Sequence, residues 1–111
     1  MAIGKIAITL KQFTKKYHPE NNEHVVHIGS TADESVKFVY MKANTPNLKR
    51  YHPHVESTFC VLEGTGKCFT NDEWKTYNRG DVIVVKGGAR QQIYPTADTL
   101  FLNTQHPLQP V

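Results

Sequence analysis

Short segments in which apolar and polar residues alternate recur along the chain, and they constrain its fold more than any other feature. They are rich in Val, Ile, Phe and Tyr, and residues that favour turns separate them. The segments are 24–28, 36–42, 58–63, 66–70, 81–85, 90–94 and 99–103. Short, regularly spaced strands are typical of sandwiches and barrels, so the sequence predicts an all-β fold.

Other parts of the chain predict different structure. "TLKQFTKKYH" (9–18) could hold a turn or two of helix, and the polar residues at 19–23 predict a loop. The connection "NDEWKTYNRG" (71–80) predicts that Trp74 caps the edge of a hairpin. The last residues, "QHPLQPV" (105–111), contain two prolines and should run along the surface.

With 111 residues, of which 39% are hydrophobic, the chain is long enough to form one core. We expect a single domain over 1–111, with an N-terminal arm at 1–22 and the barrel at about 23–106. The residues expected in the core are Phe38, Tyr40, Phe59, Val61, Ile83, Val85, Ile93 and Phe101. With Ser57, Phe59 and Val61 pointing inward, Thr58 and Cys60 should lie on the opposite face of their strand.

Charge and cysteine content exclude several classes of protein. The net charge is +3, and the basic residues form no run longer than the pairs Lys15-Lys16 and Lys49-Arg50, so we expect no nucleic-acid partner. The first residues contain no uninterrupted apolar segment, so we expect a cytoplasmic protein that does not enter membranes. Cys60 and Cys68 flank a turn, could lie on neighbouring strands, and are expected to remain reduced thiols.

The stretch "RYHPHVESTFCVLEGTG" (50–66) contains a candidate metal site. Alternate residues of a strand share a face, so His52, His54 and, if the strand continues, Glu56 would point the same way. Two imidazoles and a carboxylate suit a divalent Fe, Mn, Ni, Co or Zn ion. The alternative is that "HPH" is only an exposed turn at a strand end.

The stretch "RGDVIVVKGGARQQIYP" (79–95) adds a second candidate region. It contains a turn, an apolar strand, a glycine pair that allows a sharp reversal, and a second strand with two glutamines. Gln91 would lie near the end of a buried strand, where its amide needs hydrogen-bond partners.

These residues resemble the cupin family, whose small members are single β-barrels. Its first motif is G-x5-H-x-H-x3-4-E-x6-G, and its second is G-x5-P-x-G-x2-H-x3-N. "VLEG" (61–64) and "GDVIVV" (80–85) match in kind and order, and residues 65–79 resemble the shortest family spacer. The resemblance covers roughly residues 36 to 104 and implies a double-stranded β-helix, or jelly-roll, cupin barrel.

The resemblance leaves two registers open for the first motif. In one, His52 and His54 form the histidine pair, Glu56 follows too early, and Pro46 replaces the glycine. In the other, His52 is the second histidine, Glu56 follows at the expected spacing, and Arg50 replaces the first histidine. In the second motif Gln91 stands where the family has its histidine, Lys86 replaces the proline and Pro95 the asparagine. The implied metal ligands are therefore His52, His54, Glu56 and Gln91, a weaker set than three histidines and a glutamate.

The resemblance implies three alternative functions. The first is a metal-assisted enzyme of dioxygenase, isomerase or lyase type that acts on a small oxygenated or anionic substrate. The second is a metal-free cupin that binds or isomerises a sugar or another small ligand, and the third is a non-catalytic binding module. The candidate ligand contacts are Arg50, Tyr51, Phe59 and Tyr94.

The N-terminal segment "GKIAITL" (4–10) predicts assembly. A lone apolar strand must pair with something to satisfy its backbone groups. The sheet edge of a second copy could supply that pairing, so we expect a homodimer.

Overall fold

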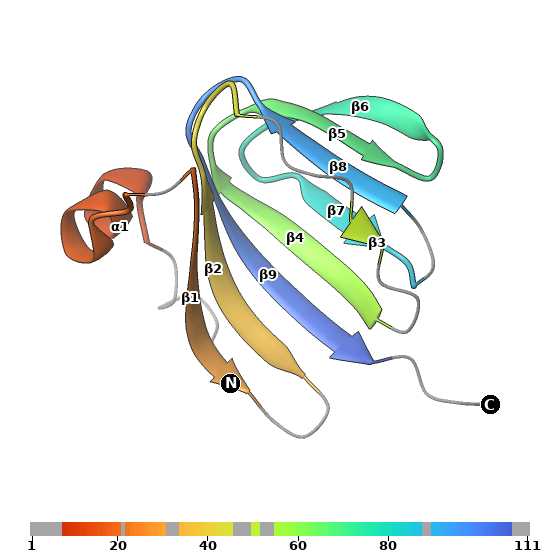
Figure 1. Cartoon of the computed structure of the whole chain (residues 1–111), viewed down its shortest axis with the longest axis horizontal. Helices are drawn as coiled ribbons and strands as arrows, with labels where there is room; N and C mark the ends of the chain where they lie inside the picture. Colours follow the sequence, from red (N-terminus) through yellow and green to blue (C-terminus); the bar gives the residue numbers. More distant parts are fainter. Residues whose placement is uncertain are drawn as a thin grey trace.

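The computed structural model describes residues 8–20, 22–30, 34–45, 50–51, 55–87 and 90–107. Within these residues one helix precedes nine strands (Figure 1). The elements are α1 (Leu10–Tyr17), β1 (Glu23–Ser30), β2 (Ser35–Met41), β3 (Arg50–Tyr51), β4 (Val55–Glu63), β5 (Gly66–Thr70), β6 (Glu73–Tyr77), β7 (Val82–Val85), β8 (Arg90–Pro95) and β9 (Thr99–Pro107).

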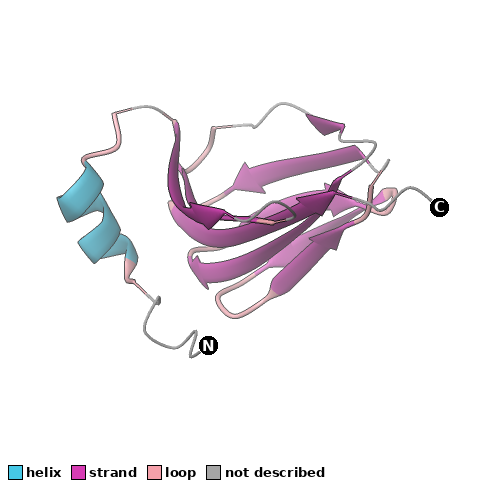
Figure 2. Ribbon diagram, turned by 90° about the horizontal axis from the view of Figure 1, so that it is seen from below, coloured by secondary structure: helices cyan, strands magenta, loops and turns pink. Residues whose placement is uncertain are grey.

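The strands form two antiparallel sheets that face each other. The five-stranded sheet has the order β1-β2-β9-β4-β7, and the four-stranded sheet has the order β3-β8-β5-β6. Figure 2 shows the strands in layers, with α1 outside them beside β1. The predicted all-β jelly-roll is confirmed.

Alternation along the strands places the main core between the sheets. In β4, Phe59 and Val61 are buried, and register pairs them with Ile83 and Phe101 on the neighbouring strands. Their aromatic contact is edge-to-face, with the Phe59 and Phe101 ring centroids 5.7 Å apart. Thr58 and the cysteine at position 60 alternate with these residues and are only partly buried, as predicted.

Phe38 and Tyr40 are buried, as predicted, but they pack outside the barrel. Their strand neighbours Val39 and Met41 belong to the cluster between the sheets, whereas Phe38 and Tyr40 join a second cluster under α1. Phe13 of α1 is fully buried there and stacks on Tyr40, with ring centroids 6.1 Å apart. Both faces of β2 are buried at this point because the helix covers the outer one.

The helix predicted at 9–18 is confirmed. Thr9 is the N-cap: its hydroxyl accepts from the Gln12 amide at 3.1 Å, and the Gln12 side chain accepts from the Thr9 amide at 2.9 Å. This capping box begins the helix at Leu10. Residues 8–10 therefore do not continue a strand, and the rest of the N-terminal segment predicted to pair with a second copy lies outside the described residues.

Two strands were not predicted, and β9 continues past its predicted end. β3 is very short, and β6 replaces part of the predicted connection 71–80. Four of the five β6 residues are exposed, so the strand lacks the buried apolar alternation that identifies strands in sequence. Trp74 packs against Phe69 across the β5–β6 hairpin, with ring centroids 5.5 Å apart. β9 runs to Pro107, so residues 105–107 belong to the sheet and not to the predicted surface tail.

The two cysteines lie on β4 and β5, the strands on either side of a short connection. Cys60 and Cys68 are both free thiols and lie in different sheets, so the prediction that they sit on neighbouring strands is wrong.

Two glycines shape the connection from β4 to β5. Gly64 has φ +109°, and a Cβ there would lie 2.6 Å from the Asp98 carbonyl oxygen. At Gly66 a Cβ would lie 2.5 Å from the Tyr94 carbonyl oxygen, so the backbones of β5 and β8 approach closely there.

Candidate functional site

Polar side chains gather on the inner face of the five-stranded sheet, at the end where β4 begins. The Lys37 ammonium donates to Gln105 Oε1 at 3.2 Å, and Gln105 Nε2 donates to the Ser57 hydroxyl at 2.8 Å. Register places Ser57 beside Gln105, and Lys37 beside Asn103. Ser57 and Asn103 are almost completely buried. Three strands of this sheet supply Lys37, Ser57, Asn103 and Gln105, and together with Gln91 of β8 we call these residues the polar end.

Gln91 comes to the polar end from the opposite sheet. It is 6% exposed and lies on the same face of β8 as the buried Ile93, two residues further on. Val85, which ends β7, is the register partner of Ser57, and a short connection joins β7 to β8, so Gln91 lies at the same end of the barrel as Ser57. Among the described residues Gln91 Oε1 has no hydrogen-bond partner.

Asn103 is the second residue of the polar end with an unsatisfied oxygen. Its Nδ2 donates to the Thr58 carbonyl at 3.1 Å, while Oδ1 finds no partner in the described part of the chain. The side chain is fully buried. A buried carbonyl without a hydrogen bond destabilises a protein by about 1 to 3 kcal/mol. The polar end therefore contains two buried carbonyl oxygens that lack a hydrogen-bond partner among the described residues.

The predicted metal ligands do not all face this end. Glu56 alternates with the buried Ser57, so it lies on the outer face of β4, where its carboxylate is 3.9 Å from His106 Nε2. Gln91 faces inward, so the two predicted ligands do not face each other. His52 and His54 lie outside the described residues.

The predicted ligand contacts do not all face the barrel interior. Phe59 is part of the core beside the polar end. The β3 backbone places Arg50 opposite Gln91 in the ladder, and Tyr51 opposite Arg90. Tyr94 lies on the face of β8 opposite to Gln91 and is half-buried, so it does not line the barrel interior.

Comparison with known proteins identifies the fold. No protein-family model matches the sequence, and no curated protein matches it either. Solved structures do match. KdgF from a Halomonas species has a TM-score of 0.74 at 15% identity, over 81% of this chain and 84% of that chain. The chain has the cupin fold. The Schizosaccharomyces pombe Cnp3 cupin domain (TM-score 0.71, 16% identity, 81% of this chain and 71% of that chain) agrees.

A predicted oxalate decarboxylase from Thermotoga maritima gives a similar match, with a TM-score of 0.72 at 17% identity over 78% of this chain and 81% of that chain. At such identities the likeness concerns the fold alone. The cupin resemblance carried by "VLEG" and "GDVIVV" is thus confirmed at the level of the fold.

A divalent metal needs several donor side chains, such as His, Cys, Asp or Glu, close together. Among the residues that the structure describes, no three His, Cys, Asp or Glu side chains come together. The polar end supplies amide and hydroxyl oxygens and the Lys37 ammonium, which disfavours a nearby cation. The described residues alone therefore do not fit a divalent metal.

Sequence reasoning found Gln91 but missed the other residues of the polar end. Lys37 and Asn103 occupy inward positions on apolar strands, two residues from Val39 and Phe101 respectively. The sequence signal that could have found them is a charged or amide residue two positions from a buried apolar residue, on the same face of its strand. Their grouping depends on strand pairing between distant segments, because Lys37 and Gln105 are 68 residues apart.

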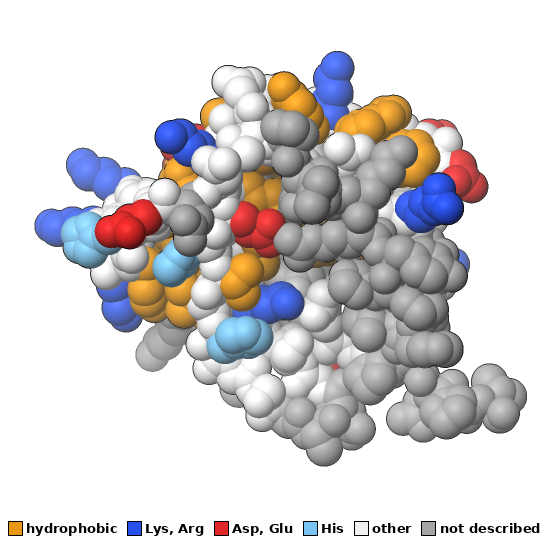
Figure 3. Space-filling view, in the orientation of Figure 1, with side chains coloured by type: hydrophobic (Ala, Val, Ile, Leu, Met, Phe, Trp, Pro, Cys, Tyr) orange, Lys and Arg blue, Asp and Glu red, His pale blue; other side chains and the backbone are white. Residues whose placement is uncertain are grey.

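The outer surface shows no gathering of one charge on the face drawn in Figure 3, where Lys and Arg side chains lie scattered among acidic and apolar ones. No helix among the described residues is both long enough and apolar enough to cross a membrane. The candidate site described above is the polar end, on the inner face of the sheets.

Proposed function

We propose that this cupin barrel binds a small, neutral, polyhydroxylated molecule at the polar end without a metal ion. The observation that carries the proposal is the pair of buried carbonyl oxygens, Gln91 Oε1 and Asn103 Oδ1, which have no partner among the described residues. Hydroxyl groups donate to carbonyl oxygens, so a polyol or sugar would satisfy both. Metal-free binding or isomerisation of such a ligand is thus better supported than the metal-assisted reaction.

The hydrogen-bond chain at the polar end supports the same class of ligand. Ser57 accepts from Gln105 Nε2, and this leaves its own hydroxyl hydrogen to donate. A ligand hydroxyl can accept from Ser57 while another donates to Gln91 or Asn103. Phe59 adds an apolar surface beside these groups, as is usual in small-molecule sites.

The metal-assisted reaction is the second candidate and rests on His52 and His54. It requires ligands beyond Gln91, because Glu56 lies on the outer face of β4. Divalent Mn, Fe, Ni, Co and Zn are the ions that such a site would take.

Calorimetry on protein treated with EDTA tests the proposal. We expect glucose or myo-inositol to bind and to raise the melting temperature, and Asn103→Leu to abolish that effect. Oxalate, the substrate class named for one fold neighbour, serves as the anionic probe. Binding of oxalate only after Mn(II) is restored would favour the metal-assisted enzyme. If none of the polyols binds, ordered water is the occupant of the polar end and the proposal fails.

A further inference from the structure

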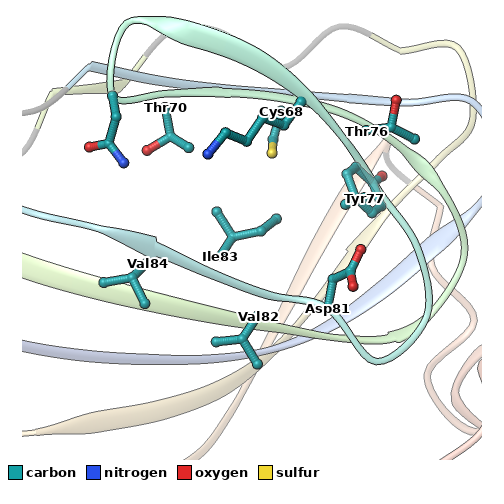
Figure 4. Close-up of a pocket in the computed structure, with 10 residues that line it drawn as sticks. Cys68, Thr70, Thr76, Tyr77, Asp81, Val82, Ile83 and Val84 are labelled. Carbon is teal, nitrogen blue, oxygen red and sulfur yellow. The ribbon is translucent and has the colours of Figure 1, made fainter.

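A hollow opens on the side of the barrel, between β7 and the β5–β6 hairpin. Its volume is about 370 Å³ (Figure 4). The lining includes Cys68, Thr70, Tyr77 and Ile83 from the two inner faces. We call it the lateral pocket. None of the polar-end residues lines it.

Thr70 gives this pocket an unsatisfied polar group. It is 5% exposed, and its Oγ1 has no hydrogen-bond partner among the described residues. In Figure 4 the Cys68 sulfur points into the hollow toward Ile83, and the Thr70 side chain lies on the same side of β5. Burial raises the pKa of the Cys68 thiol, so the group beside Thr70 is neutral. A small group that can hydrogen-bond to a hydroxyl would fit here.

The other wall of the pocket is a free strand edge. β7 is the last strand of its sheet, so within the described chain one side of it has no neighbouring strand. The Val61 amide donates to the Asp81 carbonyl at 2.9 Å. Because bonding alternates along an antiparallel pair, Ile83 is the next residue of β7 whose main chain bonds to β4. The N–H and C=O groups of Val82 and Val84 therefore point away from β4.

The side chains of Val82 and Val84 do not fill this edge. They are 59% and 41% exposed, and in Figure 4 they point away from the pocket while Ile83 points into it. Val82 and Val84 thus line the pocket with their main chain. Their donor and acceptor groups repeat every second residue, about 6.6 Å along the strand.

We propose that the lateral pocket binds a short extended peptide segment of a partner protein, which pairs with the free edge of β7. An extended peptide presents matching N–H and C=O groups at the same two-residue repeat. Its alternate side chains point to opposite faces, so one enters the pocket toward Thr70 and its neighbours lie beside Val82 and Val84. The preferred segment has a small hydroxyl residue between two β-branched apolar ones.

Titration of ¹⁵N-labelled protein with the probe acetyl-Val-Thr-Val-amide tests this proposal. We expect the amide signals of Val82 and Val84 to shift and to gain protection from hydrogen exchange, while those of Ile83 and Val85 change little. Val84→Pro removes one edge donor, and an edge strand tolerates proline where the N–H is unpaired. Binding should weaken about fivefold or more, whereas Val84→Thr, which keeps the N–H, should bind as well as the parent.

A modified probe tests the same bond without changing the protein. N-methylation of all three residues removes every N–H of the segment that could pair with β7, whichever way the peptide runs, so this peptide should lose most of its affinity. Equal binding of the two peptides would overturn the proposal. So would protection of Val82 and Val84 that appears without probe as protein concentration rises, because the edge would then pair with a second copy. Thr70→Val should weaken the threonine probe but not acetyl-Val-Val-Val-amide, and equal losses would reject the assigned contact.

Discussion

Replacing Gln91 with Met should stabilise the ligand-free protein and weaken ligand binding. Gln91 is 6% exposed, and its Oε1 lacks a partner among the described residues. A buried unpaired carbonyl costs about 1 to 3 kcal/mol, and Met has a similar length without that group. The free energy of unfolding should therefore rise by about 1 to 2 kcal/mol. In a domain of this size the melting temperature should rise by roughly 4 to 8 °C for each kcal/mol gained.

Urea unfolding of the EDTA-treated protein measures this change. Gln92→Met is the matched control, because Gln92 is the next residue of β8 and is only half-buried. Its effect should stay within about 0.5 kcal/mol. If Gln91→Met lowers the free energy of unfolding by 1 kcal/mol or more while the control is unchanged, the carbonyl is already satisfied in the free protein and the reasoning is refuted. Calorimetry should show at least about tenfold weaker polyol binding by Gln91→Met.

Three further predictions concern the core. Burial raises the pKa of Tyr77 to about 12, so the unfolded chain releases this proton first and stability falls as pH rises above about 10. Tyr77→Phe should remove about 1.4 kcal/mol per pH unit of that fall, measured by urea unfolding between pH 9 and 11; parallel curves would reject it. A thiol reagent should modify the partly exposed Cys60 faster than Cys68, which is buried and is reached through the lateral pocket; equal rates in Cys60→Ser and Cys68→Ser would contradict this. Gly66→Ala should lower the free energy of unfolding by more than about 2 kcal/mol, because the added Cβ would meet the backbone of β8. Gly29→Ala is the control, because a Cβ there has nothing within 4 Å and should change stability little. Similar melting temperatures of the two variants would disprove the close approach.

Local patterns predicted most of the fold. The capping residues around Thr9 locate α1, and alternation locates the strands that bury one face. β6 escaped prediction because an exposed edge strand has no apolar face to reveal it. Phe38 and Tyr40 were placed in the core correctly but on the wrong side of β2, because sequence does not say where α1 packs. That placement depends on a tertiary contact and not on strand period.

The candidate site was harder to predict because its residues meet only through strand pairing. Gln91 was found within one strand, whereas Asn103 and Lys37 become neighbours through the β2–β9 register. The placement of Glu56 depended on where β4 starts relative to Ser57, and a shift of one residue moves a side chain to the other face. The preceding stretch "HPH" contains a proline, so its period could not be extended from β4 with certainty.

The unsatisfied groups inside the barrel are better explained by binding than by folding. Asn103 is fully buried in phase with Phe101, at a position where an apolar side chain would pack without leaving an oxygen unpaired. Gln91 and Thr70 have the same property on the facing sheet. Each lowers the stability of the empty barrel, and sequences that break a local packing rule usually do so at functional sites. Thr70 lines the lateral pocket, whereas Gln91 and Asn103 belong to the polar end. We therefore expect replacement of Thr70 to leave polyol binding intact. Replacement of Asn103 should leave peptide binding intact. Loss of both polyol binding and peptide binding in either variant would mean that the barrel has a single site.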